Sequence, residues 1–160
     1  MNHSVLPSHR ENRSTTEPVH LLDRLIQDVA HGRFERSLSG LTAVAAAITG
    51  AEIFLEHDRA SFSNRMMWLP VALTPIVSVA AIGGVFSKRI AKTALPVASA
   101  FVLANGVQGT YLHLRGIAQR PGGWRFARYN AEMGPPMFAP LLFSMVGGMG
   151  LLAAVLRREP

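Results

Sequence analysis

Two histidines, His57 and His113, are the side chains best suited to hold a cofactor. Each lies at or just past the end of a long apolar segment, and Asn105, Gly109 and His113 recur every four residues, so they share one side of a helix. If the two segments pack together, one imidazole from each would ligate the iron of a haem b, with Gly109 leaving room. The alternative is a pair of interfacial histidines that bind water, headgroups or a carboxylate, with no cofactor.

Carboxylates lie close to His57 along the chain. Glu52 and Glu56 are four residues apart and Arg59 follows, so a ladder of paired charges is expected at the end of a helix. Together with the two histidines these carboxylates could bind a metal ion of unknown identity, although these four residues form no Glu-x-x-His pair. A proton-coupled transporter would use Glu52, because this carboxylate lies inside an apolar segment where protonation and substrate binding could compete.

Further polar groups follow in the third apolar segment and after it. Asn105 and Gln108 suit either hydrogen bonds between helices or substrate binding. The next connection alternates aromatic and cationic groups, which suit either lipid headgroups or the docking of another protein, and we expect it to lie over the two histidines. The candidates in and beside this connection are Arg115, Trp124, Arg125, Arg128 and Tyr129.

Charge is distributed very unevenly along the 160 residues. The chain is 49% hydrophobic and 16% charged, yet four windows contain a single charged residue, Glu52. A helix of about 20 residues covers the roughly 30 Å hydrocarbon core of a bilayer, so each window is long enough to span it. We therefore predict an all-α integral membrane protein with four transmembrane helices, in the windows 38–55, 67–86, 94–114 and 137–156.

Three regions are expected along the chain. Residues 1–17 lack any apolar period and predict a disordered cytoplasmic tail. Residues 18–36 predict an N-terminal amphipathic surface helix, and 37–157 form the four-helix bundle. The apolar positions of the surface helix are Leu22, Leu25, Ile26 and Val29.

Small residues indicate how the spans pack. Ala80 and Gly84, and again Gly150 and Ala154, are four residues apart, which lets neighbouring helix backbones approach closely. We expect the bundle core to be built from such contacts.

Composition excludes several classes of function. The absence of cysteine rules out disulfides, thiolate zinc sites and iron–sulfur clusters. The net charge of +6 does not indicate nucleic acid, because the 16 Lys and Arg residues are divided among short segments that cannot form one basic face. Common motifs of hydrolases and nucleotide-binding enzymes are also missing, so we expect no enzymatic activity.

The distribution of Lys and Arg predicts the orientation. Ten of them lie in the segments that share a side with the termini, and six lie in the other two connections. The positive-inside rule then places both termini in the cytoplasm of a multi-pass protein in a bacterial-type inner, or plasma, membrane.

These observations favour a non-catalytic accessory subunit that anchors or assembles a membrane complex. Its expected partners are the lipid bilayer and either another protein or further copies of itself. One alternative is a haem b or metal-binding redox subunit that uses His57 and His113. A second alternative is a small proton-coupled transporter that uses Glu52.

Overall fold

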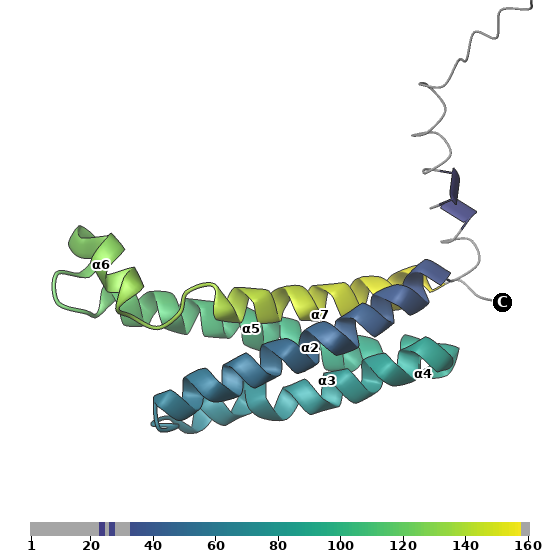
Figure 1. Cartoon of the computed structure of the whole chain (residues 1–160), viewed down its shortest axis with the longest axis horizontal. Helices are drawn as coiled ribbons and strands as arrows, with labels where there is room; N and C mark the ends of the chain where they lie inside the picture. Colours follow the sequence, from purple (N-terminus) through teal and green to yellow (C-terminus); the bar gives the residue numbers. More distant parts are fainter. Residues whose placement is uncertain (1–22, 25, 28–32, 158–160) are drawn as a thin grey trace, which may run out of the picture.

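A computed structural model describes residues 23–24, 26–27 and 33–157 (Figure 1). The predicted tail lies outside the described residues, as does most of the predicted surface helix, of which residues 33–36 belong to the first long helix. The described chain is helical and its secondary structure contains no strand. Its elements are α2 (Arg33–Arg59), η1 (Arg65–Met67), α3 (Trp68–Phe86), α4 (Lys88–Lys92), α5 (Ala94–Ala118), η2 (Gly123–Phe126), α6 (Ala127–Glu132) and α7 (Ala139–Leu156).

Four helical segments of the described chain are long and apolar enough to cross a membrane, which confirms the predicted all-α class and agrees with the four membrane-length helices expected. Helices α2 and α5 run past the apolar windows, because backbone hydrogen bonding continues into their polar ends. The charges suit this extension in α2, where Glu35 lies in the first turn and Arg59 in the last, each favourable to the helix dipole.

The four long helices form two hairpins. Helix α2 packs on α3 and α7, and α5 packs on α7 and α3, so the helices follow one another around the bundle in the order α2, α3, α5, α7. Both hairpin turns lie at one end of the bundle, and α4 joins the hairpins at the opposite end (Figure 1). The centre is closed by Ala46, Val77, Val102 and Phe143, all of which are buried.

Glycines bring α5 and α7 into backbone contact. A Cβ atom on Gly147 would lie 2.5 Å from the amide nitrogen of Leu103 and 2.7 Å from the carbonyl oxygen of Ser99. A Cβ atom on Gly106 would lie 2.8 Å from the carbonyl oxygen of Pro140. No side chain fits at such distances, which confirms the predicted close packing through small residues.

Two cationic side chains form hydrogen bonds between helices at the end of the bundle where α4 lies. Lys92 Nζ donates to the carbonyl oxygen of Ala154 at 2.7 Å, near the last turn of α7. Arg157, which is 2% exposed, donates from Nη1 to the carbonyl oxygen of Gly84 at 2.8 Å, near the end of α3. Both bonds satisfy carbonyls that the ends of helices leave without an intrahelical partner, where the helix dipole also favours positive charge.

Candidate ligand-binding cleft

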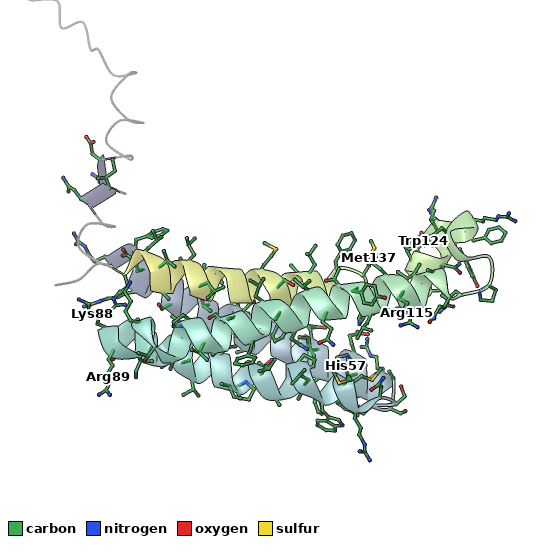
Figure 2. All side chains as sticks on the ribbon, turned by 180° about the vertical axis from the view of Figure 1, so that it is seen from behind. His57, Lys88, Arg89, Arg115, Trp124 and Met137 are labelled. Carbon is green, nitrogen blue, oxygen red and sulfur yellow. The ribbon has the colours of Figure 1, made fainter. Side chains whose placement is uncertain are left out.

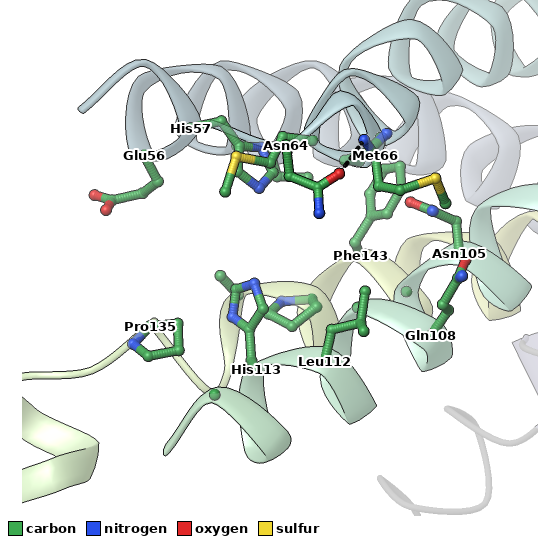
Figure 3. A pocket seen from close by; sticks show the side chains of 18 of the residues that line it. Glu56, His57, Asn64, Met66, Asn105, Gln108, Leu112, His113, Pro135 and Phe143 are labelled. Carbon is green, nitrogen blue, oxygen red and sulfur yellow. Dashed lines mark hydrogen bonds between the residues drawn. The ribbon is translucent and has the colours of Figure 1, made fainter. Parts of the chain in front are cut away.

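A cleft of about 410 Å³ lies between the two hairpins, at the end where their turns are. Helices α2 and α3 supply one wall, and α5 and α7 supply the other (Figure 3). This volume falls within the roughly 300–1,000 Å³ typical of small-molecule sites. The apolar part of the lining includes Ile53, Met66, Met67, Leu112, Pro140 and Phe143.

The two histidines face each other across this cleft. His57 comes from the last turn of α2 and His113 from α5 (Figure 3). His113 Nδ1 lies 2.8 Å from the carbonyl oxygen of Pro136, which fits a ring that donates from Nδ1 and keeps Nε2 free. His57 Nδ1 is buried and has no hydrogen-bond partner within the described residues. Each imidazole therefore has a ring nitrogen for which the described part of the chain supplies no hydrogen-bond partner.

The segment between α6 and α7 positions His113. Pro135 lines the cleft and packs 3.3 Å from the space where a Cβ atom on Gly116 would lie, and Pro136 offers its carbonyl to the imidazole. Proline fixes φ and restricts the residue before it, so two in succession give a stiff, extended entry into α7. Sequence reasoning missed this contact, because the group involved is a backbone carbonyl that any residue type carries.

The amides Asn105 and Gln108 also line the cleft, from the face of α5 that contains Gly106 and Gly109. Beside Gly109, however, the space is filled: a Cβ atom there would lie 2.9 Å from Cβ of Pro140. The glycine therefore lets α7 approach α5 on this side, and it also lines the cleft together with His113.

The two glutamates of α2 lie in different surroundings. Glu56 lines the cleft, and its Oε1 lies 2.5 Å from Nη1 of Arg59. Glu52 is exposed on the outward surface of the bundle and does not line the cleft. Of the predicted Glu-Glu-Arg ladder, only the ion pair between Glu56 and Arg59 therefore forms. Among the described residues no three of His, Asp and Glu lie close enough together to hold a metal ion.

An aromatic stack closes the turn of the first hairpin. Phe62 stacks on Trp68 with 4.0 Å between ring centroids, and Phe54 lies 5.7 Å from Phe62 on another side. Ser61 and Phe62 have φ values of 55° and 42°, in the left-handed region that bulky residues rarely adopt. Stacking offsets this strain, and it places the Phe62 ring 6.2 Å from that of His57.

The second hairpin ends in a compact segment made of η2 and α6, which we call the knob. It packs on the end of α5 and projects beyond the ends of α2 and α3 (Figure 1). Asn130 is 1% exposed, and its Nδ2 donates to the carbonyl oxygens of Pro121 at 3.2 Å and Gly123 at 2.8 Å. Gly122 and Gly123 have positive φ values, of 78° and 50°, which make the turn before the knob. The knob therefore lies beyond the histidines, whereas Pro135 and Pro136, later in the same connection, lie against the cleft beside His113.

Large side chains on the knob are exposed. Trp124 (labelled in Figure 2), Phe126 and Tyr129 are each more than half exposed, and Arg125 is also exposed. Arg128, also exposed, lies 3.0 Å from Glu132.

The predicted candidates are thus divided between two surfaces. Those that line the cleft are Glu56, His57, Asn105, Gln108, His113 and Arg115. Those on the knob are Trp124, Arg125, Arg128 and Tyr129. Glu52 and Arg59 belong to neither surface. Cleft residues that sequence reasoning did not single out include Asn64, which caps η1 by accepting from the amide of Met66 at 2.9 Å.

Comparison of the chain with protein-family models, curated proteins and solved structures finds no match.

Proposed function

We propose that the protein is a non-catalytic subunit that anchors or assembles a complex in a bacterial-type inner membrane, with the knob as its docking surface. Both termini are placed in the cytoplasm by the excess of Lys and Arg on that side, so the cleft and the knob face the opposite side of the membrane.

One observation carries this proposal: exposed Trp124, Phe126 and Tyr129 are grouped with arginines on a support that Asn130 holds in place. Aromatic residues and Arg are enriched at protein interfaces and supply much of their binding energy. A surface that is already ordered loses less conformational entropy on binding than a free loop would.

The length of α5 also suits this role. Its 25 residues extend for about 38 Å, which exceeds the roughly 30 Å hydrocarbon core, so its far end carries the knob to the membrane surface. There a partner's soluble part can reach it. Trp and Tyr also bind headgroups at this depth, so the test must separate protein docking from contact with lipid.

Purification in mild detergent provides that test. Chains that co-purify in fixed proportion with the wild type should be lost when Trp124 and Tyr129 are both changed to Ala. Phe86→Ala is the matched control, because Phe86 is a strongly exposed aromatic residue in the last turn of α3, at the end of the bundle away from the knob. Retention of the same chains by the double variant would refute docking on the knob and leave headgroup contact as its role.

A haem b redox subunit is the second candidate, and it is favoured by the two histidines that face each other across the cleft. The bond from His113 to the Pro136 carbonyl resembles the outer contacts that orient metal-bound histidines. His57 and His113 would then be the axial ligands of the haem iron.

This candidate is tested by the absorption spectrum of protein purified from haem-replete cells. A Soret band should appear and should be lost in His57→Ala and in His113→Ala, whereas Arg59→Ala, outside the cleft, should keep it. A colourless wild-type preparation would remove the candidate.

A further inference from the structure

The outward face of α2 carries a carboxylate within an apolar stripe. Leu41, Val44, Ile48 and Leu55 are all exposed, and Glu52 is exposed at the matching helical spacing. The stripe ends beside the charged last turn of α2, so Glu52 lies about one turn inside the apolar part of the helix.

Nothing within the described part of the chain pairs with Glu52. It forms no hydrogen bond or ion pair there, because the nearest cation along the helix, Arg59, binds Glu56, which belongs to the cleft. In a membrane the Glu52 side chain would therefore meet lipid, where a carboxylate is costly and is normally found against a partner.

The same face permits close approach by another helix. Ala47 and Ala51 are both exposed, four residues apart, beside Glu52. Small residues at this spacing let a second helix backbone come near, and so bring a side chain of that helix to the carboxylate.

From the exposed Glu52 and its alanine neighbours we infer that this face of α2 docks a transmembrane helix of another protein, one that presents Arg or Lys at the depth of Glu52. The positive charge complements the carboxylate in a medium that weakens electrostatic interactions far less than water does. Arg is especially suited, because its planar group can bind both carboxylate oxygens. The inference rests on the proposed assembly role and adds a second contact, within the membrane, to the one on the knob.

Energy transfer in phosphatidylcholine vesicles tests this docking. The full chain carries the donor, and the acceptor is on a synthetic Leu/Ala transmembrane peptide that has one Arg a helical turn from its end, or on the same peptide without Arg. Transfer to the Arg peptide should exceed transfer to the apolar peptide. Glu52→Gln should abolish the excess, while Glu52→Asp, which keeps the charge, should retain it.

Asp58→Asn is the matched control, because Asp58 is an exposed carboxylate in the charged last turn of the same helix and belongs neither to the apolar stripe nor to the cleft, and it should keep the excess. The inference is overturned by equal transfer to both peptides, or by an excess that survives in Glu52→Gln. It is also overturned if two labelled copies of this chain associate through Glu52, since a second copy would then be the occupant. The co-purification test with the Trp124 and Tyr129 variant does not depend on this result, so the two proposals fail separately.

Discussion

Adjacent glycines in α7 provide a sharp test of how the bundle is packed. A Cβ atom on Gly147 would lie 2.5 Å from the Leu103 nitrogen and 2.7 Å from the Ser99 oxygen, whereas one on Gly148 would meet nothing within 4 Å. Both positions are inside the same apolar helix, so Gly147→Ala and Gly148→Ala share the same gain in helix propensity, up to about 1 kcal/mol. The difference between the variants therefore isolates the contact between α5 and α7.

The size of the effect follows from the geometry. Leu103 and Ser99 present backbone atoms, which cannot rotate aside, so α7 must retreat from α5 to admit the methyl group of Gly147→Ala. Overpacking of this kind costs about 1–3 kcal/mol. We expect the free energy of unfolding of Gly147→Ala to be lower than that of Gly148→Ala by about this amount.

Titration with SDS in mixed micelles, followed by far-ultraviolet circular dichroism, measures these free energies. The wild type should fall between the two variants or close to Gly148→Ala. Equal free energies for Gly147→Ala and Gly148→Ala would refute the close approach of α5 and α7.

Three further expectations concern other parts of the chain. Asn130→Ala removes two hydrogen bonds to backbone carbonyls, so the knob should become sensitive to trypsin while the long helices keep their circular dichroism. Glu132→Gln breaks only an exposed ion pair with Arg128 and keeps every trypsin site, so it should stay resistant; equal cleavage of both variants would contradict the role of Asn130. Lys92→Met should lower the free energy of unfolding by about 1–3 kcal/mol through loss of a charged hydrogen bond to α7, and no change in the same SDS titration would argue against this cap. A reporter fused after Pro160 should read cytoplasmic, and an exported reading would reverse the assignment of every connection.

The fold was largely predictable, because a helix long enough to cross a membrane requires an uncharged window that the sequence displays directly. The ends were less predictable. Helix α2 begins at Arg33 and ends at Arg59, outside the window 38–55, because hydrogen bonding along the backbone does not stop where the apolar side chains stop.

The site was predictable only in part. The sequence places His57 and His113 at the ends of two spans, but whether they face each other depends on how α2 and α5 are rotated. The same rotation separates Glu52 from Glu56. The two residues are one helical turn apart and differ by only about 40° around the helix axis, yet Glu56 lines the cleft and Glu52 is exposed on the outward surface.

The direction of the third connection could not be predicted, because it is set by individual backbone angles and hydrogen bonds. Positive φ values at Gly122 and Gly123, with the two bonds from Asn130, hold η2 and α6 against the end of α5. Composition alone gave the aromatic and cationic character of this segment but not its position.

The bonds from Lys92 and Arg157 tie the helix ends together on one side, while the cleft separates the two hairpins on the other. When the angle between the hairpins changes, the hairpins therefore pivot about these tied ends. Displacement grows with distance from the tied ends, so a small tilt widens or narrows the distance between His57 and His113 in the cleft.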